Sequence, residues 1–148
     1  MNYTKKQNAF SLMEMMVVLF IIGLILSLMG PQIAKFFGKA KVSGTKAILS
    51  QLKSSILEYN MDIGHFPKKD EGGLNALVEA PSRPEIAQKW SGPYTKEDFL
   101  RDKWDNDIIY NCPAEKYKDK FKNFEVISYG KNGEEGGTGE DADLYDGA

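Results

Sequence analysis

Very few residues in this sequence have the chemistry of an active site. The chain holds one histidine, His65, and one cysteine, Cys112, which leaves little room for a histidine-based zinc site and excludes an intramolecular disulfide. We expect Cys112 to be a small buried apolar residue rather than a reactive thiol, and His65 to be solvated or packed in a turn. Since nothing pairs a nucleophile with a base, we expect a protein that is not an enzyme.

One carboxylate lies where a charge is costly. Glu14 falls inside the apolar segment NAFSLMEMMVVLFIIGLILSLMG, residues 8–30. About 20 apolar residues are enough to cross a bilayer as a helix, and carboxylates inside such a span are generally functional and paired. Lys5 and Lys6 precede the run, which places the amino terminus on the cytoplasmic side. A cleaved secretory signal is the alternative, although this run is longer than a usual signal core.

A second group of charges lies in the segment 130–148. It holds many acids against Lys131 alone and is rich in glycine. Carboxylates beside glycines, which let backbone carbonyls turn inward, suit a calcium ion, although the spacing is not that of an EF-hand loop. A disordered acidic tail is the other interpretation. Composition alone favours neither the calcium loop nor the disordered tail.

The periodicity of the chain predicts the scaffold that positions these residues. The continuous apolar run ends at Gly30-Pro31. Beyond it, apolar residues recur at spacings of three and four among polar ones, as in an amphipathic helix. We therefore expect one helix from Phe10 to about Asn60. Residues 10–30 would span the membrane. Residues 31–60 would turn an amphipathic stripe toward a globular head.

The remaining residues, 61–148, predict a small head. LNALVEAP suggests a short helix that ends before Pro81, and the β-branched and aromatic segments 107–112 and 123–130 predict two strands. Between these strands, lysines alternate with aromatic residues over 113–122. Such a pattern is more typical of a solvated loop than of a nucleic-acid patch.

Bulk composition agrees with a single small domain. A chain of 148 residues with 42% hydrophobic residues is long enough for one domain. Its net charge of −2 does not favour nucleic acid or an anionic membrane surface as a partner.

Taken together, the segments resemble a known family. AFSLMEMMVVLFIIGLILSLMGP resembles the amino-terminal signature of type IV pilin-like proteins. The later segments are similar, in order, to the major pseudopilins of type II secretion systems: YNMDIGHFPKKDEGGLNALVEAP, WSGPY, DKWDNDIIY and SYGKNGEEGGTGEDADL. The resemblance implies an α+β, pilin-like fold, in which a long amino-terminal helix packs on a small carboxyl-terminal antiparallel sheet with a Gly/Asp-rich calcium loop.

The same resemblance implies how the chain is processed, where it is located and how it assembles. Residues 1–9 would be a leader that prepilin peptidase removes between Ala9 and Phe10, with methylation of the new amino terminus. The mature chain would be a single-pass inner-membrane protein with a periplasmic head. It would polymerise into a pseudopilus, with minor pseudopilins and an inner-membrane assembly platform, to drive protein export across the outer membrane. Glu14 would pair with the amine at Phe10 of a neighbouring subunit.

The resemblance further implies calcium bound in the loop 129–146. The implied ligands are the side chains of Asn132, Asp141 and Asp143 and backbone carbonyls near Tyr129 and Glu134.

This chain departs from the family pattern at several places. Ala9 stands where glycine usually precedes the cut, which predicts slower processing. Asn132 stands where aspartate is usual, so one ligand charge is lost. The usual Asp-Pro-Trp-Gly block is Asp-Lys-Trp-Asp at 102–105.

Two alternatives stay open at this point. A type IV or competence pilin shares the amino-terminal signature, although the lack of a cysteine pair argues against it. A single-span anchored calcium-binding domain that does not polymerise would leave Glu14 without a purpose.

Overall fold

The computed structural model describes residues 10–148, which divide into two units, one that ends at Phe37 and one that begins at Gly38. The predicted leader 1–9 and the residue before the predicted cut, Ala9, lie outside the described residues.

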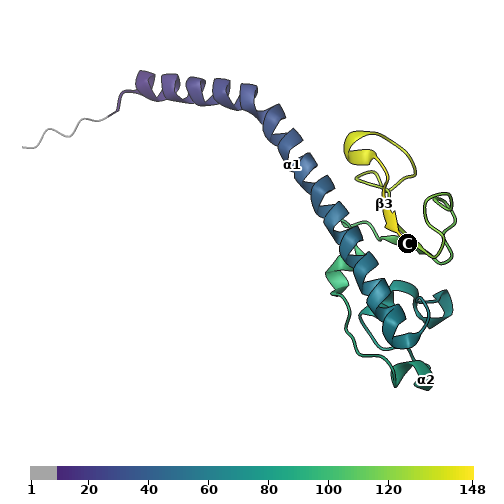
Figure 1. The fold of residues 1–148 in the computed structure, drawn as a ribbon. Coiled ribbons are helices and arrows are strands. Elements are labelled where there is room, and N and C mark those ends of the chain that lie inside the picture. Colours follow the sequence, from purple (N-terminus) through teal and green to yellow (C-terminus); the bar gives the residue numbers. More distant parts are fainter. Residues whose placement is uncertain (1–9) are drawn as a thin grey trace, which may run out of the picture. The chain divides into compact units, whose positions relative to one another are not determined.

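The long helix predicted from the sequence is confirmed. Helix α1 extends over Leu12–Ile63, a length of 52 residues, and is the purple-to-teal ribbon of Figure 1. Pro31 lies inside it and has no N–H to donate to the carbonyl of Ser27, but the helix continues through it. The helix ends where Gly64, with φ of +96°, donates its N–H to the carbonyl of Asn60 at 2.9 Å, as glycines commonly do at this position.

The first unit presents apolar side chains to its surroundings on all sides. Residues 10–36 of this unit are exposed around the whole circumference of the helix, with Leu12 84% and Phe20 71% accessible. Within the described part of the chain, α1 alone is long and apolar enough to cross a membrane. A helix that is apolar all round needs lipid or other helices as its solvent.

The second unit, from Gly38 onward, encloses the core with the amphipathic half of α1. The stripe expected from the periodicity is buried: Ile48, Leu49, Leu52, Ile56 and Tyr59. Thr45 and Ser55 are buried beside it, because Thr45 Oγ1 accepts the N–H of Lys103 and Ser55 donates its hydroxyl to the carbonyl of Tyr94.

Three short antiparallel strands form the sheet, in the order β1-β2-β3. They are β1 (Ile109–Asn111), β2 (Glu125–Ser128) and β3 (Leu144–Gly147). Ile109 pairs with Ile127, and Ile127 with Tyr145. The two predicted strands are confirmed, although each is shorter than its segment.

Strand β3 lies in the acidic segment and was not predicted. It is the yellow arrow in Figure 1. Its pairing with β2 is reinforced from α1, where Lys53 Nζ lies 3.0 Å from Asp146 Oδ1. The interpretation of this segment as a disordered tail is therefore wrong.

The connections between α1 and the sheet are mostly single turns. The segment LNALVEAP forms a 3₁₀ turn, Gly73–Leu77, rather than an α-helix. The segment expected to be irregular contains a one-turn helix, α2 (Pro84–Ala87). Further 3₁₀ turns lie at Lys69–Glu71, Glu97–Leu100 and Gly139–Asp141.

Candidate functional site

The start of α1 holds Glu14 in its first turn. Ser11 precedes the helix, and its Oγ accepts the backbone N–H of Glu14 at 3.2 Å. This is half of the Ser-x-x-Glu capping box, and an acidic residue there also suits the positive end of the helix dipole. Glu14 thus also has a local role in starting the helix, which the apolar pattern of the sequence does not reveal.

Glu14 is a charged residue in apolar surroundings. It is the one charged residue between Phe10 and Lys35, and it is exposed among apolar side chains that are also exposed. In lipid or in a helix bundle such a carboxylate needs a cationic partner, since an unpaired charge is expensive away from water. Cleavage before Phe10 would create an amine, in its own or a neighbouring chain, with the required charge.

Glycines shape the second candidate site, the loop 129–146. Gly130 and Gly137 have φ of +69° and +100°. A Cβ on Gly130 would lie 2.6 Å from the carbonyl oxygen of Glu140, and one on Gly137 would lie 2.5 Å from that of Asp141. The loop folds back on itself so closely that only glycine fits at these two positions.

The predicted calcium ligands bond largely within this loop. Asp143 Oδ1 accepts the N–H of Gly136 at 2.8 Å, and Asn132 Oδ1 accepts the N–H of Glu134 at 3.2 Å. Asn132 and Glu134 are exposed, and Asp141 and Tyr129 are half-buried. Residues 10–148 contain no group of three or more His, Cys, Asp or Glu side chains placed to hold a metal ion.

Calcium prefers six to eight oxygen ligands, so the donors as arranged here do not fit a calcium ion. Calcium binding by this loop stays a prediction.

The loop carboxylates instead meet an ammonium group. Lys116 Nζ lies 2.7 Å from Asp143 Oδ2 and 2.8 Å from Glu135 Oε1, and 4.7 Å from the centre of the Tyr129 ring. Burial disfavours the charged form, but the hydrogen bonds to Asp143 and Glu135 outweigh it and raise the pKa of Lys116 above its ordinary value.

Lys116 comes from the segment 113–122, which the sequence predicts as a solvated loop. That prediction holds for the exposed Lys118 but is wrong for Lys116 and Tyr117, which are half-buried. The Tyr117 ring stacks on Tyr145 of β3 with centroids 3.8 Å apart. The alternation of lysines with aromatic residues was the sequence feature that could have indicated this arrangement. Here it reflects the packing of Tyr117 on β3.

A buried carboxylate on β2 holds this segment in place. Glu125 is fully buried and accepts N–H bonds from the backbone of Lys116 and Tyr117 at 2.8 and 2.7 Å. The Glu115 N–H and the Asn111 amide also donate to it. Burial raises the pKa of Glu125, but these hydrogen bonds prevail and lower it overall.

A second carboxylate fixes the point where the loop begins. The buried Asp102 accepts the hydroxyl of Ser128 at 2.7 Å and the N–H groups of Trp104 and Asn106 at 2.8 and 3.0 Å. Asn106 in turn donates its amide to the carbonyl of Gly130 at 2.7 Å. The block at 102–105 therefore supports the loop from the side of β2.

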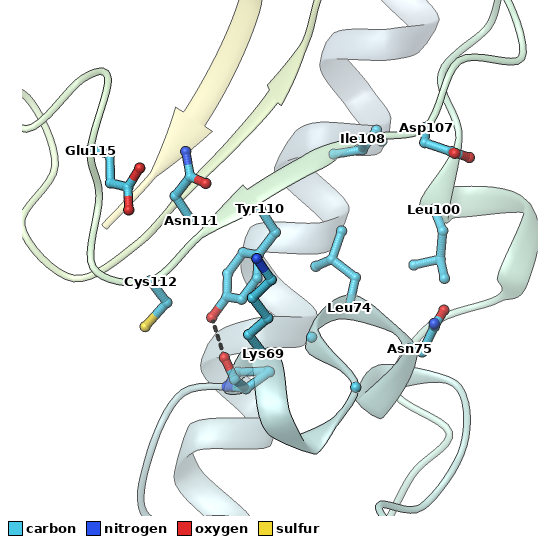
Figure 2. A pocket seen from close by; sticks show the side chains of 13 residues that line it. Lys69, Leu74, Asn75, Leu100, Asp107, Ile108, Tyr110, Asn111, Cys112 and Glu115 are labelled. Atoms are coloured by element: carbon cyan, nitrogen blue, oxygen red, sulfur yellow. Dashed lines mark hydrogen bonds between the residues drawn. The ribbon is translucent and has the colours of Figure 1, made fainter.

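A separate cavity of about 520 Å³ opens beside β1. In Figure 2, Tyr110 donates its hydroxyl to the carbonyl of Pro67, at 3.0 Å, and burial raises the pKa of Tyr110 far above its ordinary value. Cys112 lines this cavity and is exposed, so the prediction of a buried Cys112 is wrong. None of the residues predicted as functional lines the cavity.

His65 is partly packed, as expected for a ring in a turn. Its Nδ1 lies 2.9 Å from the carbonyl oxygen of Phe66 and 3.6 Å from Glu71 Oε2. Its ring meets that of Tyr59 edge to face.

Comparison with known proteins covers nearly the whole chain. Residues 4–30 match the family model of the prokaryotic N-terminal methylation motif, and residues 32–147 match that of type II secretion system (T2SS), protein G.

Named relatives agree with these family matches. The chain is 34% identical to type II secretion system core protein G of Vibrio cholerae over 146 residues, which is 97% of this chain and 94% of that protein. It is also 34% identical to the core protein G of Escherichia coli (strain K12), over 92% of this chain and 90% of that protein.

A solved structure has the same fold. It is the crystal structure of the major pseudopilin from the type 2 secretion system of enterohaemorrhagic Escherichia coli, with a TM-score of 0.55 and 21% identity. The match covers 80% of this chain and 91% of that chain.

Proposed function

Because the chain belongs to the family of type II secretion system protein G, we propose that it is the major pseudopilin of such a system. Its role is structural: copies of the chain polymerise through their amino-terminal helices into a pseudopilus that drives protein export across the outer membrane. This role uses α1 as both a membrane anchor and the core of the filament.

The observation that carries this proposal is the surface of the first unit. Apolar side chains cover the whole circumference of α1 up to Ile33, with Glu14 as the one charge among them. Before assembly, lipid surrounds the apolar side chains; after assembly, neighbouring copies of α1 pack against them. The charge of the Glu14 carboxylate is neutralised only when a cation pairs with it. Glu14 is therefore suited to control the transfer of a subunit from the bilayer into the filament.

The processing that prepares this cation is part of the proposal. The match of residues 4–30 to the N-terminal methylation motif supports cleavage between Ala9 and Phe10 by prepilin peptidase and methylation of the Phe10 amine. The secondary amine keeps its positive charge. It would then pair with Glu14 of the adjacent subunit in the filament.

Topology and partners follow from the same role. The mature chain crosses the inner membrane once, with its amino terminus cytoplasmic and its head, from Gly38 onward, in the periplasm. An inner-membrane assembly platform inserts subunits from the bilayer, and minor pseudopilins join the same filament.

Replacement of Glu14 tests the proposal in cells that lack their own copy of the gene. Glu14→Gln removes the charge but keeps a residue that fits a capping box. We expect this variant to insert into the membrane and to be processed, but to form no filaments and to secrete no exoprotein. Sheared filaments and the secreted exoprotein are measured by immunoblot.

Ser11→Ala is the matched control, because it removes the cap of α1 and keeps the charge. We expect it to assemble. Filaments of normal yield from Glu14→Gln would contradict the assembly role, and a mature protein that retains Met1 would favour an anchored domain that does not polymerise.

A further inference from the structure

The ammonium of Lys116 lies where the carboxyl-terminal loop gathers negative charge. Its two carboxylate partners, Glu135 and Asp143, stand near opposite ends of the tight turn made by 136–143, at 2.8 and 2.7 Å. The Tyr129 ring lies 4.7 Å away on the strand side of the loop. One cation thus contacts two residues that precede the turn and the residue that ends it.

Asp143 has few lone pairs left for another cation. Its side chain is 12% exposed; Oδ1 accepts the N–H of Gly136 at 2.8 Å, and Oδ2 faces Lys116 Nζ and the Tyr117 hydroxyl, at 2.7 and 3.4 Å. A divalent ion at Asp143 would have to displace the ammonium.

The position of Lys116 is fixed before its side chain reaches the loop. The N–H groups of Lys116 and Tyr117 bond to the buried Glu125 of β2, and the Tyr117 ring stacks on Tyr145. The backbone of Lys116 is therefore fixed beside the loop, so that only side-chain entropy is lost when its ammonium binds Asp143.

The remaining predicted ligands are poor for a divalent ion. Asn132 carries an amide where the family usually has a carboxylate, and its Oδ1 accepts the N–H of Glu134. A neutral ligand in place of an anion, together with a positive charge at the centre, lowers the attraction of this loop for calcium.

We propose that Lys116 is the resident cation of this loop, so that the head closes the loop with its own ammonium instead of with bound calcium. The proposal concerns the closure of the head and stands independently of the role in secretion.

The test uses the full-length protein in detergent and follows its melting temperature by tryptophan fluorescence. In the wild type we expect the same melting temperature in EGTA and in millimolar calcium chloride, because a ligand that does not bind the folded state cannot stabilise it. A melting temperature that rises with calcium and falls with EGTA would overturn the proposal.

Lys116→Met keeps much of the apolar stem and removes the charge. We expect its melting temperature in EGTA to fall by several degrees, because the half-buried Asp143 then lacks its partner, and calcium to recover part of the loss. Lys118→Met is the matched control, since Lys118 is exposed on the same segment. Equal behaviour of the two variants would overturn the proposal.

A double-mutant cycle separates a cation clamp from general packing. If Lys116 acts through Asp143, the losses of Lys116→Met and Asp143→Asn do not add in the double variant. Fully additive losses would contradict the pairing. Should Lys116→Met fail to fold, the milder Glu135→Gln, paired with the exposed Glu134→Gln as its control, gives the same comparison.

Discussion

The carboxylate of Glu125 accepts the backbone N–H of Lys116 at 2.8 Å, so the central strand of the sheet fixes the segment from which the ammonium reaches Asp143. A buried anion thereby positions an internal cation through the main chain. Both groups lie in the head, from Gly38 onward.

Glu125→Gln tests this positioning. The amide keeps the shape of the side chain, but its N–H₂ group faces either the Tyr117 N–H at the place of Oε2 or the Glu115 and Lys116 N–H groups at the place of Oε1, and the charge is lost. We expect the free energy of unfolding to fall by about 1.5–3 kcal/mol, since hydrogen bonds to charged groups are worth that much. Urea denaturation measures it. The exposed Glu115→Gln serves as the control and should change little.

The same carboxylate predicts loss of stability in acid. The pKa of Glu125 is lowered in the folded head, so its contribution is fully present above the pKa of the unfolded chain, about 4.3, and is lost as the pH falls through the folded value. The wild type should therefore lose more stability below about pH 4.3 than Glu125→Gln does. Parallel stability curves for the two proteins would contradict this expectation.

Gly130→Ala and Gly136→Ala separate steric conflict from backbone strain. Both residues have positive φ. A Cβ on Gly130 would lie 2.6 Å from the Glu140 carbonyl oxygen, whereas a Cβ on Gly136 would have no such neighbour within 4 Å. We expect a loss of about 1–2 kcal/mol for Gly136→Ala and a clearly larger one for Gly130→Ala. Chemical denaturation gives both values, and equal losses would argue against a tightly folded loop.

Asp105 predicts a stabilising substitution. Its φ of +70° is the one positive value among the non-glycine residues of the described chain, and glycine is usual at this place in the family pattern. Asp105→Gly should raise the free energy of unfolding by about 0.5–1 kcal/mol. Asp105→Asn removes only the exposed ion pair with Arg101, worth little. A glycine variant no more stable than the asparagine variant would refute the argument.

Processing is tested on the protein extracted from membranes. Intact-mass analysis should find a chain that begins with N-methylated Phe10, and deletion of prepilin peptidase should leave Met1 in place. Ala9→Gly should mature faster in a pulse–chase experiment, because it restores the usual residue before the cut. Equal rates would show that Ala9 is as good a substrate residue as glycine.

The long-range architecture was largely predictable from the chain. The three-to-four spacing of apolar residues predicts α1, which buries one stripe, and β-branched segments predict the half-buried β1 and the fully buried β2. Strand β3 has only Leu144 as a buried large apolar residue. Its order comes from pairing with β2 and from the contact of Asp146 with Lys53, which local pattern does not reveal.

The candidate loop was recognisable, but its partner was not. Clustered acids and glycines drew attention to 129–146, whereas Lys116 stands in a segment whose composition is typical of a surface. Glu125, a lone acid between apolar strand residues, was the better clue. A carboxylate in a buried strand needs donors, and those donors are the backbone groups beside Lys116.

The pairing of β3 with β2 also sets an order of events during synthesis. Every segment that β3 contacts, including Lys53 and the whole of β2, precedes it in the chain. The apolar half of α1 therefore leaves the ribosome well before the head has the last strand of its sheet. On the proposed single-pass topology, the nascent chain would meet the membrane with its head still unfolded, and the head would cross as an extended polypeptide and complete its sheet afterwards.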